Sequence, residues 1–78
     1  MFIEIKPNEM VNVTEIAAFY MFPESESDYC KRRLFLRMKG ANDSLTFDFS
    51  TMRECNSAYR KIINALKRCN IIVEENEE

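Results

Sequence analysis

Two segments in the middle of the chain, residues 32–39 and residues 44–49, alternate regularly between apolar and polar side chains. Alternation with a period of two is typical of a β-strand that buries one face and exposes the other. Gly40 and Asn42, in the loop between these segments, tolerate the positive φ angles of a hairpin turn. We therefore predict an antiparallel hairpin. Its inward-facing side chains are Leu34, Leu36, Met38, Leu45, Phe47 and Phe49.

The N-terminal third of the chain contains further strand patterns. Residues 1–6 alternate in the same way and end at Pro7, which has no backbone N–H group to donate. Residues 10–13 form a candidate short strand, and residues 16–22 are apolar at every position. A continuous apolar run of this length predicts a strand that is covered on both faces. The polar, acidic segment 23–28 follows it and predicts an exposed loop.

Apolar residues at helical spacing follow Thr51. Thr51 and Glu54 fit a capping box, in which each side chain satisfies a backbone N–H group at the start of a helix. We predict an amphipathic helix over residues 52–69, with Asn70 as its C-terminal cap and Ile71 as the apolar contact of that cap. The buried stripe of this helix consists of Cys55, Tyr59, Ile62, Leu66 and Cys69.

Together these elements predict an α+β fold: an antiparallel β-meander of four to five strands, with one C-terminal amphipathic helix packed on one sheet face. The chain has 78 residues, which leaves room for one core only. We place this single domain at residues 1–73 and expect a short edge pairing by residues 71–73. Residues 74–78 hold four glutamates and are predicted to be a disordered acidic tail.

The order of strands followed by one long helix resembles that of transcription-coactivator-type single-strand-binding proteins and of shortened pleckstrin-homology-like domains. The segment Val11-Asn12-Val13-Thr14-Glu15-Ile16 also resembles the strand-turn-strand entry of small bacterial and phage β-meander proteins. Both resemblances concern the order of elements, so no functional residue is carried over from them.

Positive charges gather in the middle of the chain, although the formal net charge is −2. Residues 29–70 hold ten of the eleven Lys and Arg residues and only three acidic residues, whereas both flanking segments are acidic. Such asymmetry leaves two interpretations open. Either the opposite charges neutralise each other on a solvated surface, or the basic block forms a binding face.

Residue types that carry catalysis or bind metals are scarce. The chain has no histidine, one glycine, and three widely spaced cysteines, Cys30, Cys55 and Cys69. It therefore lacks the commonest general base, a glycine-rich phosphate loop and a CxxC metal pair. We predict that the protein is not an enzyme and that it uses no cofactor and no metal.

The N-terminal residues do not predict export, because Glu4 and Lys6 interrupt the apolar stretch that a signal peptide needs. No run approaches the roughly 20 apolar residues that span a bilayer, so no membrane partner is predicted. We expect a cytoplasmic protein whose thiols are reduced.

One helix covers only one side of a sheet, which leaves apolar side chains without an intramolecular partner. Phe2, Phe19, Met21 and Phe35 are the candidates for an interface on the sheet face opposite the helix. We hypothesise that the protein homodimerises or binds another protein through this face. A small regulator or inhibitor encoded by a phage or mobile element would act in this way.

The alternative hypothesis is single-stranded nucleic-acid binding. Arg33, Phe35, Arg37 and Lys39 share one side of the predicted strand 32–39 and place an aromatic ring between cations. Platforms of this kind stack a base on the ring while the cations hold phosphates. One aromatic residue is a minimal platform, and no RNP-type motif accompanies it.

Overall fold

The described part of the chain folds into five strands, one short 3₁₀ helix and one long α-helix. The structure is a computed structural model, and it describes residues 1–23, 30–42 and 44–69. In chain order the elements are β1 (Phe2–Lys6), β2 (Glu9–Asn12), η1 (Val13–Glu15), β3 (Ile16–Pro23), β4 (Lys31–Met38), β5 (Ser44–Asp48) and α1 (Met52–Arg68). The predicted α+β class is confirmed.

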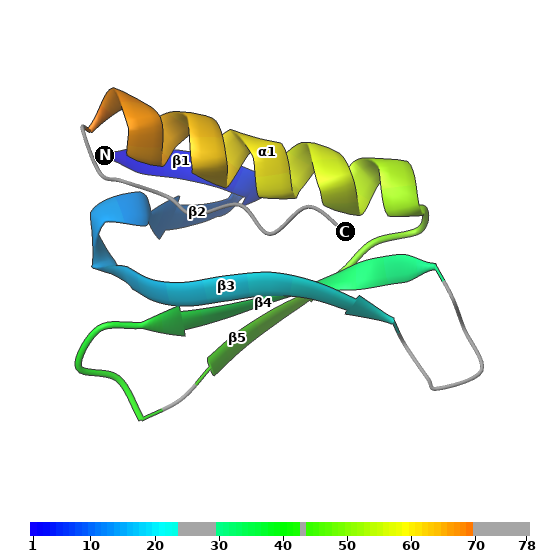
Figure 1. The fold of residues 1–78 in the computed structure, drawn as a ribbon, viewed down its shortest axis with the longest axis horizontal. Helices are drawn as coiled ribbons and strands as arrows, with labels where there is room; N and C mark the ends of the chain where they lie inside the picture. The colour runs from blue at the N-terminus through cyan, green and yellow to red at the C-terminus, as the bar shows by residue number, and fades with distance from the viewer. Residues whose placement is uncertain (24–29, 43, 70–78) are drawn as a thin grey trace.

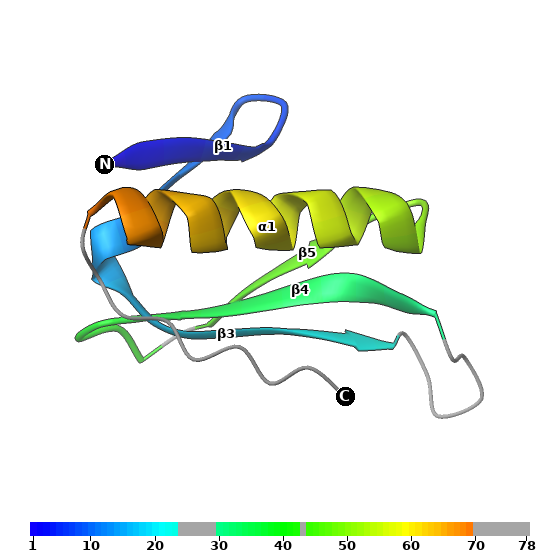
Figure 2. The same cartoon turned by 45° about the horizontal axis from the view of Figure 1, so that its top comes forward.

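The strands form two antiparallel sheets, not one meander. β1 pairs with β2, and β3, β4 and β5 form a three-stranded sheet in that order. Figure 1 shows α1 lying along the three-stranded sheet, and Figure 2 shows it between that sheet and β1. The helix contacts β4 and β3 of the three-stranded sheet, and it also contacts β1 and η1.

The separation of the sheets arises at η1. The Asn12 side chain accepts hydrogen bonds from the Thr14 backbone N–H at 3.3 Å and from the Thr14 hydroxyl at 2.9 Å. These bonds hold a 3₁₀ turn directly after β2, so the chain changes direction before β3 begins. Side-chain capping of this kind competes with strand pairing, and the alternation of apolar residues does not reveal it.

The predicted hairpin is confirmed in position, and the structure supplies its register. Leu34 lies opposite Phe47, and Leu36 lies opposite Leu45. Gly40 has a φ of 71° in the connecting turn, a left-handed conformation that glycine adopts without steric cost. Leu34, Leu36 and Phe47 are buried, whereas Leu45 is 41% exposed at the end of the sheet.

The helix begins as the sequence predicts. The Glu54 backbone N–H donates a hydrogen bond to the Thr51 hydroxyl oxygen at 3.1 Å, which is the threonine half of the capping box. The helix extends to Arg68, one residue short of the prediction. The predicted cap at Asn70 and Ile71, the edge pairing of residues 71–73 and the tail at residues 74–78 lie outside the described residues.

The core lies where α1 meets the sheet. It combines Leu34 and Leu36 of β4 with Ile62 of α1, all fully buried, and the N-terminal segment closes it with Val11 and Val13. The predicted helix stripe is confirmed by these contacts. Cys55, Ile62 and Leu66 are buried in the core, and Tyr59 and Cys69 pack against it.

Truncation of the helix stripe tests this packing. We expect Leu66→Ala to lower the free energy of unfolding by about 2–5 kcal/mol, because Leu66 is buried and the change leaves a cavity. The same truncation at half-exposed Leu45 should cost roughly 1 kcal/mol or less. Chemical denaturation of the two variants measures the difference, and equal midpoints would contradict the docking of α1 on the sheet.

Candidate interaction surface

The register of β3 against β4 determines which side chains lie on the sheet face opposite α1. Tyr20 lies opposite Phe35, with the other outward pairs on either side of it along the strands. On β5, Thr46 lies opposite Phe35 and extends the same row. We call this surface the outer face. It consists of Ala18, Tyr20 and Phe22 of β3, Arg33, Phe35 and Arg37 of β4, and Ser44, Thr46 and Asp48 of β5.

Three aromatic rings meet on the outer face. The Tyr20 and Phe35 rings are stacked, with centroids 4.7 Å apart and planes inclined by 29°. Phe22 lies 5.9 Å from Tyr20 in a tilted arrangement. These separations lie within the range of favourable aromatic pairs. Tyr20 remains 50% exposed, so the cluster presents apolar surface to solvent.

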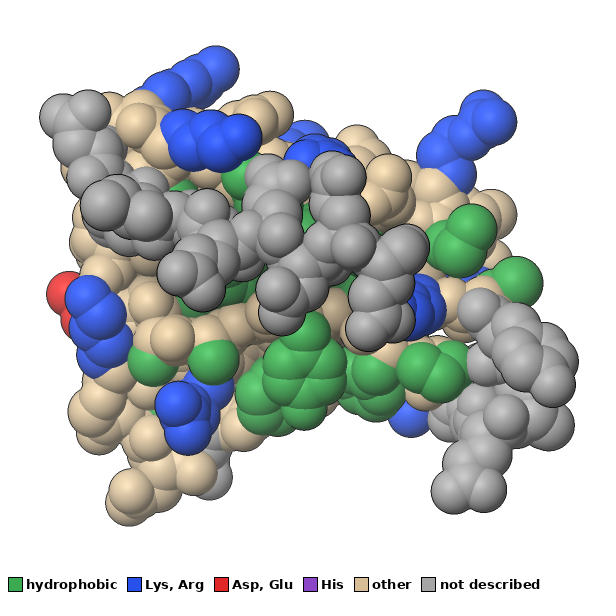
Figure 3. All heavy atoms as spheres, viewed as in Figure 1, with side chains coloured by type: hydrophobic (Ala, Val, Ile, Leu, Met, Phe, Trp, Pro, Cys, Tyr) green, Lys and Arg blue, Asp and Glu red, His purple; other side chains and the backbone are tan. Residues whose placement is uncertain are grey.

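Cationic side chains border the rings. Arg33 Nε donates to Asp48 Oδ1 at 2.7 Å, and the Arg33 guanidinium lies 6.0 Å from the centre of the Phe22 ring. Arg37, which follows Phe35 by two residues on β4, is exposed. In the space-filling view, hydrophobic side chains follow β3, with Lys and Arg side chains beside them (Figure 3).

The Arg33–Asp48 pair supports the first interpretation of the charges for this part of the surface. Opposite charges there neutralise each other across β4 and β5. Lys39 lies just beyond β4 and is exposed, and its backbone N–H donates to the Glu15 carbonyl at 2.7 Å. The outer face therefore combines an aromatic cluster with partly neutralised charge.

Two of the four predicted interface residues lie on the opposite side of β3, which corrects their predicted position. Phe19 and Met21 pack against the core, and the Phe19 ring lies 5.2 Å from the Tyr59 ring of α1. Phe2 is 64% exposed but belongs to β1, in the other sheet. Phe35 is the member of the predicted set that lies on the outer face.

Tyr20 and Phe22 are the outer-face residues that the sequence prediction missed. Alternation shows that they share one side of the strand 16–22, but it does not show which side the helix covers. The pairing of Tyr20 with Phe35 supplies that information. The expectation that residues 16–22 are covered on both faces is also wrong within the described chain, since Tyr20 is exposed.

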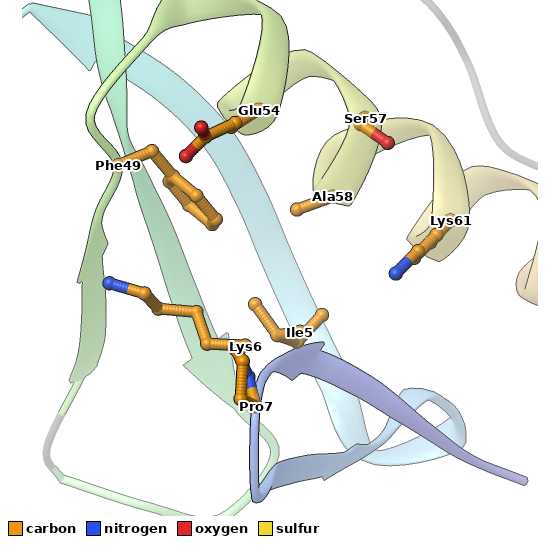
Figure 4. A pocket seen from close by; sticks show the side chains of 8 residues that line it. All are labelled: Ile5, Lys6, Pro7, Phe49, Glu54, Ser57, Ala58 and Lys61. Carbon is orange, nitrogen blue, oxygen red and sulfur yellow. The ribbon is translucent and has the colours of Figure 1, made fainter.

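A hollow lies between β1 and α1. It has a volume of about 240 Å³ and is lined by both apolar and charged side chains. Figure 4 shows Lys6 extended toward the Phe49 ring, with Glu54 and Lys61 on the helix side. Lys6 lies 5.2 Å from the centre of the Phe49 ring and donates to the Asp48 carbonyl oxygen, so the lysine is fixed as a structural contact.

This hollow has little capacity for ligand chemistry. Its volume is below the roughly 300–1,000 Å³ typical of small-molecule sites.

Across the described residues, no group of three His, Cys, Asp or Glu side chains is placed to hold a metal ion. No α-helix in the described part of the chain has the length and apolarity to cross a bilayer.

Comparisons with protein-family models, with curated proteins and with solved structures give no match for this chain. No functional residue is therefore transferred from a relative. The function proposed below follows from the geometry of the outer face and of β3.

The three thiols differ in their environments. Cys30 is exposed, Cys69 is partly buried and Cys55 is fully buried in the core. Burial raises the pKa of the Cys55 thiol above its usual value of 9.0, because the fold disfavours the thiolate. The stabilising contribution of the neutral thiol is therefore complete below pH 9 and is lost as the pH rises above it.

Thiol titration of the folded protein tests these assignments. With an aromatic disulfide reagent at pH 8 we expect Cys30 to react first and Cys55 to react only when the chain unfolds. Burial of Cys55 suppresses both the formation of its thiolate and the access of the reagent to it. Denaturant should make all three thiols react at similar rates. Equal rates in the native protein would contradict the burial of Cys55.

Proposed function

We propose that this is a non-enzymatic interaction protein that self-associates through the outer face and through the outer edge of β3, which borders that face. The observation that carries the proposal is the cluster of Tyr20, Phe22 and Phe35, which no described element covers. Exposed apolar surface is unfavourable by about 25 cal/mol per Å², so burying the cluster against another protein surface would be stabilising. Small proteins often use clusters of this kind as interfaces.

The chemistry of the outer face supports binding more than catalysis. Its acidic group, Asp48, is engaged by Arg33, and its remaining polar groups are arginine and hydroxyl side chains. A general base would have to lie within hydrogen-bond reach of the substrate proton that it removes, with its acceptor atom unoccupied. The proposal therefore assigns no catalytic residue and no cofactor.

A cytoplasmic setting belongs to the same proposal. None of the three cysteines is in a disulfide, as is usual in a reducing compartment. A short chain that acts through one protein-binding surface suits a regulator or inhibitor, such as those of phages and mobile elements.

Self-association tests the proposal directly. We expect sedimentation at micromolar concentration to give twice the 9.3 kDa chain mass. Tyr20→Glu should raise the dissociation constant by about tenfold or more, because it buries an unpaired charge in the contact.

Phe2→Glu is the matched control, because Phe2 is 64% exposed on β1, in the other sheet. It also replaces an exposed aromatic ring with a carboxylate, as Tyr20→Glu does. This variant should associate like the original protein. A monomer in every sample, or equal effects of the two substitutions, would contradict the proposal.

Single-stranded nucleic-acid binding is the second candidate, and the structure adds a specific observation in its favour. Phe35 lies between Arg33 and Arg37 on an open sheet face, and Tyr20 stacks on it. The outer face thus offers more than one ring to a base. The Arg33–Asp48 pair weighs against this candidate, because it already neutralises one of the cations.

Binding of labelled oligonucleotides, followed by fluorescence anisotropy, distinguishes the second candidate. If it holds, Phe35→Ala should weaken binding by about 1–3 kcal/mol through lost stacking. Arg37→Ala should reduce the salt dependence by about one released ion, whereas Arg53→Ala on α1 should leave it unchanged. Absence of binding at low salt would remove this candidate and leave the first one intact.

A further inference from the structure

Among the described residues, the outer edge of β3 is an unpaired strand edge. β3 and β5 are the two edges of the three-stranded sheet, and no described segment pairs with the outer edge of β3. Edge strands normally carry charges, bulges or prolines, or are very short, because their unpaired backbone groups attract other strands. β5 is short and ends in Asp48, whereas β3 has eight residues and no charged one.

The devices that protect an edge occur only at the two ends of β3. Pairing with β4 is irregular near Ala17 and again between Phe22 and Pro23. Between these points the segment Ala18–Phe22 pairs with β4 in regular register. In an antiparallel pair, alternate residues direct their N–H and C=O groups away from the partner strand. The regular segment therefore presents a straight row of backbone donors and acceptors.

We propose that a second copy of the chain pairs antiparallel with β3, on a two-fold axis at Tyr20. The inference rests on the proposed self-association and identifies both the partner and the contact. Tyr20 is the midpoint of the regular segment, so pairing about it uses all five residues and leaves both irregular ends outside. It also makes the contact self-complementary, as a two-fold dimer requires.

This register places uncharged side chains opposite one another at every position. Tyr20 meets Tyr20 of the second copy, and Ala18 lies opposite Phe22 on the outer face. On the inner face, Phe19 lies opposite Met21, a favourable aromatic–thioether pair. Cross-strand pairs of aromatic and apolar side chains stabilise antiparallel sheets, and no charged residue occurs in the contact.

The described elements leave room for this pairing. The two β4 strands would be three strand spacings apart, or about 14 Å. α1 contacts β4 more extensively than β3, so the two helices would lie at a similar separation, wider than the about 8–10 Å of packed helices. Arg33 and Arg37 of the two copies would be further apart than the Debye length of about 8 Å. The six strands would form one sheet with one continuous outer face.

The experiment is filtered nuclear Overhauser spectroscopy on a mixture of isotope-labelled and unlabelled full-length protein. We expect intermolecular backbone contacts along Ala18–Phe22, with residue 18 near residue 22 of the other copy. Tyr20→Lys should raise the dissociation constant by about tenfold, because like charges would lie directly opposite each other. Mixing Tyr20→Lys with Tyr20→Glu should restore a dimer, now a heterodimer.

Phe35→Lys separates strand pairing from face-to-face packing. In the strand-paired dimer Phe35 lies two strand spacings, about 10 Å, from the other β3, so the dimer should persist. Chemical-shift spectra of each variant report whether it is folded.

A dimer that Phe35→Lys dissociates, without intermolecular backbone contacts along β3, would overturn the strand pairing and leave the proposed function standing. A monomer at all concentrations would overturn both. A monomer whose β3 amides contact residues 71–73 would show that the chain covers its own edge, and it would likewise overturn the pairing.

Discussion

The packing of α1 against the inner face of β4 is the interaction on which the rest of the molecule depends. Leu34 and Leu36 of β4 and Ile62 of α1 have no solvent exposure, and the N-terminal segment adds Ile5, Val11 and Val13 to the same core. A domain of 78 residues buries a modest share of its surface, so this contact supplies much of its stability. The helix can cover only one face of the sheet, and the described part of the chain has no second α-helix.

The character of the outer face follows from that constraint. Strand geometry sends alternate side chains of β3 and β4 away from the helix, and those side chains include Tyr20, Phe22 and Phe35. The rings stack on one another because water is the alternative, and the Arg33–Asp48 pair limits the local charge. The face is thus suited to contact with another protein surface, and the proposed strand pairing would join the outer faces of two copies into one.

The proposed contact uses the sheet edge as well as its face. β3 lacks the charged residues that keep natural edges apart, and its irregularities stand at its ends. Backbone pairing there would extend the sheet without disturbing the core, because α1 lies mainly over β4. The interface would therefore depend on β3 and the fold mainly on β4, with Phe19 and Met21 contributing to both.

The sequence by itself determined the local elements. Alternation predicted the hairpin of β4 and β5, and Thr51 with the apolar spacing behind it predicted α1 to within one residue. These features depend on neighbours a few positions apart, so they are legible in one chain. Only the tertiary structure decided that η1 divides the strands into two sheets. It also decided that Phe19 faces the helix and that Tyr20 lies on the sheet face away from it. An apolar run such as residues 16–22 has two apolar sides, and which side is buried depends on where a helix thirty residues further along the chain comes to rest.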